Sequence, residues 1–109
     1  MRLSALLIAL LIPSTLFAAE QNLSLKVAGN CGSCKKKIVK AAESVSGVDD
    51  ATWDKKTKIF TAKFDDTKTN KDAIVNAILK AGYDVEDKKG DDEAYKNLPD
   101  CCQYRDRSH

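Results

Sequence analysis

Histidine and proline are both scarce in this chain of 109 residues. The only histidine is the last residue, His109, so no histidine lies near Cys31 and Cys34 in sequence to complete a zinc tetrahedron. The sequence contains no Ser/His/Asp set, no paired carboxylates and no phosphate-binding loop, so no catalytic mechanism is indicated and we expect no enzyme. The net charge of +2 is too small to indicate a nucleic-acid-binding surface.

Residues 1–19 have the pattern of a signal peptide. Arg2 forms the basic start, Leu3 to Ile12 form the apolar run, and small residues for cleavage follow at Ala18 and Ala19. We expect cleavage after Ala18 or Ala19 and a periplasmic protein with no stable membrane anchor. An uncleaved anchor is the alternative, which the short run and Pro13 disfavour.

Two of the four cysteines, Cys31 and Cys34, form a Cys-x-x-Cys motif between two different periodic patterns. Alternating apolar residues precede the motif, which is typical of a strand, and apolar residues at helical spacing follow it. The sequence therefore predicts a strand-to-helix loop with Cys34 in or near the first helical turn. The open amides of a helix start favour a thiolate, the form that both soft metal ions and disulfide exchange require.

The periodicity predicts one small α+β domain over residues 21–87. The predicted order is strand, helix, strand, strand, helix, strand, at about residues 22–27, 33–46, 48–53, 58–64, 71–81 and 83–86. This βαββαβ order is typical of a ferredoxin-like sandwich, with two helices on one face of a four-stranded antiparallel sheet.

Together these features resemble the heavy-metal-associated domain family, especially its periplasmic mercuric-ion binding proteins and soluble copper carriers. The resemblance lies in Gly29-Asn30-Cys31-Gly32-Ser33-Cys34, Gly47-Val48, Phe64-Asp65-Asp66 and Ala81-Gly82-Tyr83. It implies that Cys31 and Cys34 are the metal ligands. The chain departs from the family where a methionine usually steadies the loop, because Gly29 stands at that position.

Two thiolates on one loop suit Hg(II) or Cu(I), in preference to Zn(II) or Cd(II), because zinc prefers four ligands. We therefore expect an exported carrier that holds the ion between Cys31 and Cys34 and passes it on by thiol exchange. The resemblance implies a membrane metal transporter or a periplasmic efflux component as the partner. We expect a monomer that binds no nucleic acid.

Two other functions use the same cysteines. One is a thiol–disulfide oxidoreductase, because Cys-x-x-Cys at a helix start also suits redox exchange. Such folds usually place a proline loop beside the pair, and the only proline after the leader, Pro99, lies outside the predicted domain. The other is a small interaction domain stabilised by disulfides, for which four cysteines allow three pairings.

Residues 88–109 are predicted to form a flexible tail that carries Cys101 and Cys102. The linker is long enough to bring this pair back to the metal loop, where both cysteines would be auxiliary ligands. The alternatives are a free tail and a tail bonded to another molecule. Tyr83 is expected to approach the Cys-x-x-Cys pair and shield it from water, the alternative being a plain core tyrosine.

Overall fold

The computed structural model describes residues 20–106, so the predicted signal peptide and His109 lie outside the described part of the chain. The elements follow the order β1 (Glu20–Lys26), α1 (Gly32–Glu43), β2 (Val48–Trp53), β3 (Ile59–Asp65), α2 (Lys71–Lys80) and α3 (Asp92–Lys96), and then the 3-10 turns η3 (Asp100–Cys102) and η4 (Tyr104–Asp106). Within residues 20–106, no helix has the length and apolar character needed to cross a membrane.

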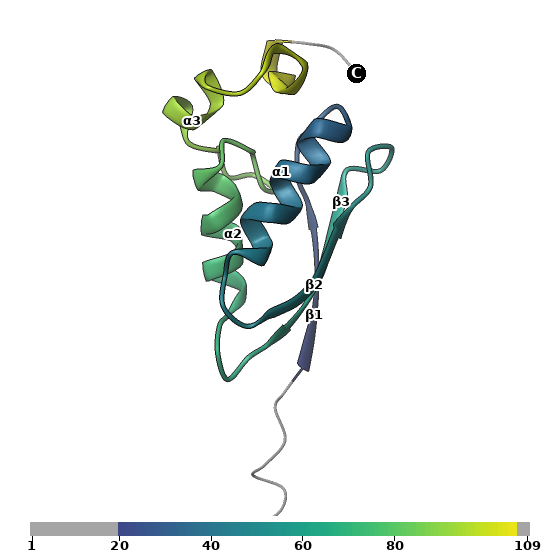
Figure 1. The fold of residues 1–109 in the computed structure, drawn as a ribbon, viewed down its shortest axis with the longest axis vertical. Coiled ribbons are helices and arrows are strands. Elements are labelled where there is room, and N and C mark those ends of the chain that lie inside the picture. Colours follow the sequence, from purple (N-terminus) through teal and green to yellow (C-terminus); the bar gives the residue numbers. More distant parts are fainter. Residues whose placement is uncertain (1–19, 107–109) are drawn as a thin grey trace, which may run out of the picture.

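The sheet is antiparallel, with β3 in the centre between β1 and β2. Phe60, Ala62 and Phe64 alternate along β3 and are all buried, as the period of a half-buried strand predicts. The α1 and α2 helices cover the same face of this sheet and contact each other (Figure 1). The predicted α+β architecture with helices on a sheet is confirmed.

Each helix buries one apolar stripe against the sheet. Cys34, Ile38 and Ala42 are the buried residues of α1, at helical spacing. Asn70 caps α2 by accepting a hydrogen bond from the amide of Ala73 at 2.9 Å. The core between the layers contains Leu25, Val27, Cys34, Ile38, Ala42, Trp53, Phe60, Ala62, Phe64, Ile74, Val75, Ile78, Tyr83 and Val85.

The predicted fourth strand is reduced to one bridge, so the sheet has three strands within residues 20–106. Val85 pairs with Val27, and the amide of Glu86 donates to the carbonyl of Lys26 at 2.8 Å. Glu86 then adopts a φ of 54°, and Val85 forms a second bridge to Lys88. The chain thus turns back immediately after Val85, which leaves no room for a longer strand.

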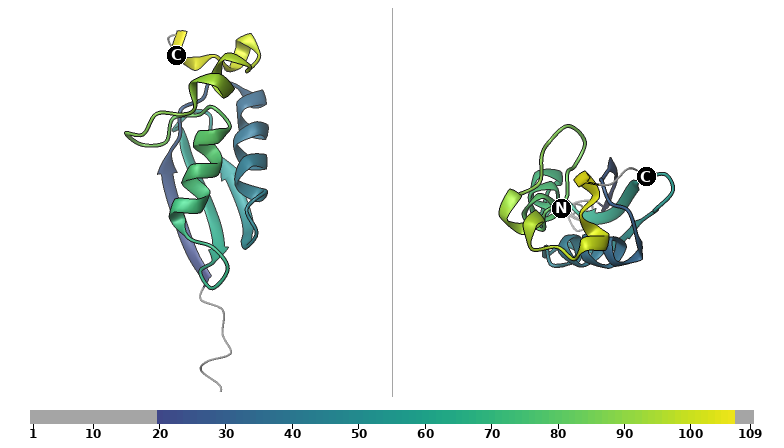
Figure 2. Two further views of the ribbon diagram at one scale, coloured as in Figure 1. Left: turned by 90° about the vertical axis from the view of Figure 1, so that its left-hand side faces the viewer. Right: turned by 90° about the horizontal axis from the view of Figure 1, so that it is seen from above.

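Residues 91–106 differ from the flexible tail that the sequence predicts. Asp91 caps α3 by accepting from the amide of Ala94 at 2.9 Å, and Tyr95 and Cys102 are both buried. The yellow segment at the end of the chain lies across the end of the molecule at which α1 begins (Figures 1 and 2). The tail therefore covers the loop that carries the Cys-x-x-Cys motif, and η3 contacts α1.

Candidate metal centre

The Cys-x-x-Cys pair lies where the loop after β1 enters α1. Cys31 is the N-cap of α1 and is half-buried, whereas Cys34 lies in the first turn and is fully buried. The helix thus begins one position earlier than expected, and Cys31 takes the cap. The two Sγ atoms lie 3.6 Å apart, and no disulfide joins them.

The helix start makes Cys31 acidic. Partial burial works against its thiolate, but the amides of Cys34 and Ser33 and the thiol of Cys34 outweigh this and lower the pKa of Cys31 to about 7. A thiol with this pKa is partly ionised at neutral pH. Cys31 is therefore ready to bind a soft cation.

The loop before Cys31 is fixed by Trp53 and Lys58. The indole Nε1 of Trp53 donates to the carbonyl of Val27 at 3.0 Å, and the Lys58 ammonium donates to the carbonyl of Gly29 at 2.6 Å. A Cβ at Gly29 would lie 2.9 Å from Trp53 Cζ2, so the indole fills the space beside residue 29. We infer that Trp53 steadies this loop in place of the missing methionine.

The tail brings its two cysteines to the same loop. The Sγ atoms of Cys31 and Cys102 lie 3.8 Å apart, and those of Cys101 and Cys102 lie 4.0 Å apart. The Cys31 thiol also donates to the carbonyl of Cys101 at 3.3 Å. All three Sγ atoms, of Cys31, Cys101 and Cys102, lie within 4.8 Å of one another, so they could bind one metal ion.

Tyr83 lies beneath this cluster and is fully buried. Its hydroxyl has no partner in hydrogen-bond geometry among the described residues. Burial raises the pKa of Tyr83, and the neighbouring thiols of Cys102 and Cys34 raise it further. The structure thus places Tyr83 both beside the thiols and in the core, and its shielding of the Cys-x-x-Cys pair stays a prediction.

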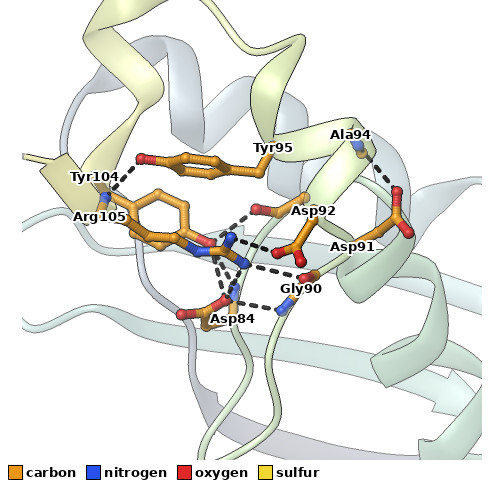
Figure 3. A network of polar contacts seen from close by, with 9 residues as sticks. Asp84, Gly90, Asp91, Asp92, Ala94, Tyr95, Tyr104 and Arg105 are labelled. Carbon is orange, nitrogen blue, oxygen red and sulfur yellow. Dashed lines mark hydrogen bonds and ion pairs between the residues drawn. The ribbon is translucent and has the colours of Figure 1, made fainter.

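Arg105 anchors the tail to the domain (Figure 3). Its guanidinium forms ion pairs with Asp84 at 2.9 Å and Asp92 at 2.8 Å, and it lies 4.3 Å from the centre of the Tyr95 ring. The Tyr104 hydroxyl donates to the carbonyl of Gly82 at 2.7 Å. These contacts fix the residues on both sides of Cys101 and Cys102.

The structure therefore brings Cys31, Cys34, Cys101, Cys102 and Tyr83 to one end of the molecule. The sequence did not reveal that Trp53 and Lys58 hold the loop by hydrogen bonds, or that Arg105 anchors the tail by ion pairs. Trp53 is buried in the core. The missing methionine was the one available indication that another side chain must support the loop.

The chain is similar to known metal-binding proteins in both sequence and structure. The family model of the heavy-metal-associated domain matches residues 25–84. The mercuric transport protein periplasmic component of Acinetobacter calcoaceticus is 40% identical over 70 residues, which cover 62% of this chain and 75% of that protein. The region that the family model matches includes the loop that carries Cys31 and Cys34.

Two further similarities differ in extent. The copper-exporting P-type ATPase of Staphylococcus saprophyticus is 36% identical over 59 residues, which are 54% of this chain but 7% of the ATPase. The chain thus spans a small part of that relative. The crystal structure of oxidized MerP from Ralstonia metallidurans CH34 is 32% identical and matches with a TM-score of 0.59 over 62% of this chain and 96% of that one.

Proposed function

Because the chain belongs to the heavy-metal-associated domain family, we propose that it is an exported carrier of Hg(II) or Cu(I). In this proposal, residues 1–19 direct export to the periplasm, and residues 21–87 form the metal-binding domain. Cys31 and Cys34 hold the ion as thiolates. The protein binds and transfers the ion and catalyses no reaction.

The observation that carries this proposal is the pair of Sγ atoms of Cys31 and Cys34, 3.6 Å apart at the start of α1. Thiolates prefer soft ions. The backbone that carries the two cysteines is held in place by the hydrogen bonds from Trp53 and Lys58. The names of the relatives support mercury and copper as cargo and the periplasm as the location.

Transfer follows from the different exposure of the two thiols. Cys34 is fully buried, whereas Cys31 is half-buried and faces the loop surface. An incoming thiolate would bind the ion from the side of Cys31, and the Cys31 thiolate would then leave and take up a proton. We propose a membrane metal transporter or a periplasmic efflux component as the acceptor, because the mercuric relatives are named as transport components.

Native mass spectrometry of the reduced protein without its leader tests this function. With Hg(II) or Cu(I), we expect one ion per chain. We expect Cys31→Ser and Cys34→Ser each to abolish tight binding, because each removes one of the two loop thiolates that hold the ion. Ser33→Ala is the matched control, because Ser33 lies between the cysteines and is exposed. Wild-type affinity in both cysteine variants would place the site elsewhere.

A further inference from the structure

We propose that Cys101 and Cys102 act together with Cys31 and Cys34 as ligands, so that a single metal ion is bound by at least three thiolates. The inference deepens the proposed function, on which it rests. The tail lies outside residues 25–84, the part that the family model matches. The additional ligands would therefore be a property of this chain and not of the common domain.

The sulfur separations fit a site with more than two ligands. Four thiolates at about 2.3 Å from a tetrahedral metal ion lie about 3.8 Å from one another, whereas two opposed thiolates lie about 4.6 Å apart. The Cys31–Cys34 and Cys31–Cys102 separations are 3.6 and 3.8 Å. Both are close to the edge of a tetrahedron, and the Cys101–Cys102 separation of 4.0 Å is also close to it. Cys34 lies outside the group formed by Cys31, Cys101 and Cys102, so these three are the ligands that the structure already brings together, and Cys34 would join them as the fourth by a small movement.

The tail is held where these thiols are needed. Tyr104, two residues after Cys102, stacks on Tyr83 with ring centres 5.7 Å apart. Before the pair, Tyr95 is buried, and its hydroxyl accepts from the amide of Arg105 at 2.9 Å. The segment is therefore fixed at both ends, so its cysteines reach the loop without a large loss of chain entropy on metal binding.

The buried hydroxyl of Tyr83 is the second observation that indicates a ligand. It faces the thiols of Cys34 and Cys102 and has no partner in hydrogen-bond geometry within residues 20–106. Neutral thiols are weak acceptors, whereas a metal-bound thiolate carries negative charge and accepts more strongly. The hydroxyl would thus acquire a partner when the thiols bind a metal ion.

Binding needs no oxidant or reductant. Each ligating thiol loses its proton to solvent as its sulfur forms a bond to the metal ion. With three or four thiolates the site admits Zn(II) and Cd(II) in addition to Hg(II) and Cu(I), because zinc prefers tetrahedral sites that include four cysteines. The thiols of an acceptor protein must then replace the tail thiolates on the metal ion as well as those of the loop.

X-ray absorption spectroscopy of the Zn(II) and Hg(II) forms counts the sulfur atoms on the metal. For the reduced full chain without its leader, we expect at least three sulfur atoms on Zn(II). The double variant Cys101→Ser, Cys102→Ser should have two sulfur atoms on the metal and should lose tight Zn(II) binding, because zinc prefers four ligands. We expect a smaller loss of Hg(II) affinity, since two thiolates suffice for that ion.

Two further variants keep this test conclusive. Cys102 is fully buried, so Cys102→Ala avoids the burial of a hydroxyl that serine would introduce. Lys96→Ser is the control, because Lys96 is an exposed residue of the same tail and its replacement removes no thiol. Two sulfur atoms on the metal in the wild type, with tight binding that depends on Cys31 and Cys34, would overturn this inference and leave the carrier function standing. No tight binding of any ion would overturn both.

Discussion

Gly29 illustrates at the scale of one residue how the core dictates the metal loop. A Cβ at this position would meet the indole of Trp53 at 2.9 Å, and ordinary contacts are longer. The indole in turn donates a hydrogen bond to the carbonyl of Val27 at 3.0 Å. The loop backbone thus rests directly on a buried ring, and a side chain at residue 29 would push the two apart.

We therefore expect Gly29→Ala to lower the free energy of unfolding by about 1–3 kcal/mol, the usual cost of overpacking. Gly32→Ala is the control, because a Cβ there meets nothing within 4 Å and alanine favours the helix that begins at Gly32. Urea denaturation of the two variants measures the difference. Equal stabilities would show that Trp53 does not support the loop.

The hydroxyl of Tyr83 is expected to destabilise the metal-free protein and to stabilise the metal-bound form. A buried hydroxyl without a partner costs about 1–3 kcal/mol. Tyr83→Phe should therefore leave the metal-free protein as stable as the wild type or more stable. It should at the same time weaken Hg(II) and Zn(II) binding several-fold, since the thiolates lose a hydrogen-bond donor.

Tyr95→Phe is the comparison for this effect, because the Tyr95 hydroxyl accepts from the amide of Arg105 at 2.9 Å and is part of the anchor. That variant should lose stability and retain its metal affinity more closely. Thermal unfolding and chelator competition measure the two quantities. Metal affinity unchanged in Tyr83→Phe would make Tyr83 a plain core residue.

At the scale of elements, the part of the chain that sequence reasoning could predict is the part with a clear period. The bounds of β2 were predicted correctly, and those of β3 and α2 were close, because alternating or helically spaced apolar residues mark them. The prediction of a last strand was wrong because Glu86 has a left-handed backbone conformation that ends the pairing, and no glycine or proline in the sequence marks that turn. The sequence did not predict the packing of the tail, because Tyr95, Tyr104 and Arg105 lie in a polar segment with no helical or strand periodicity.

The anchor of this tail depends on pH. Partial burial opposes ionisation of Asp84, but the amide of Gly90, the Arg105 guanidinium and the Tyr104 hydroxyl outweigh it, so the pKa of Asp84 lies below its ordinary value. A carboxyl group with a lowered folded-state pKa contributes stability at neutral pH, and that stability is lost as the pH falls through the lowered pKa. The tail should therefore detach in acid before the sheet unfolds.

NMR amide shifts of residues 91–106, followed as the pH is lowered from neutral to about 2, well below the ordinary aspartate pKa, measure this release. We expect the tail shifts to move together in strong acid while those of β3 stay in place. In Arg105→Ala the tail should already be loosened at neutral pH and should lack the acid step, whereas Lys96→Ala, on the exposed side of α3, should behave as the wild type. Tail shifts that change only with global unfolding would contradict the Asp84–Arg105 anchor.

At the scale of the whole molecule, the domain and its tail bring their four cysteines to the same end. The loop after β1, the first turn of α1, Tyr83 and η3 all meet there, and residues from 31 to 102 contribute. The sequence pattern predicted the loop pair, since Cys-x-x-Cys is local. The approach of Cys102 is a contact across 71 positions in sequence, and it depends on an anchor that the pattern does not reveal.

A carrier must also release its ion to another protein without releasing it to water. In the proposed carrier, the half-buried Cys31 would offer the entry point for an incoming thiolate, and the tail thiols, once displaced, would leave the ion accessible. Exchange of this kind proceeds through a complex of both proteins with the ion. Its rate must therefore depend on the acceptor.

The most direct measurement is the rate at which the Hg(II)-loaded or Cu(I)-loaded protein passes its ion to a soluble acceptor with two thiols, followed over a range of acceptor concentrations. Thiol exchange predicts a rate that rises in proportion to acceptor concentration while that concentration is low, and that rises further when Cys101 and Cys102 are replaced by serine. A rate independent of acceptor concentration in both proteins would mean that the ion first dissociates into solution, and would contradict the carrier function.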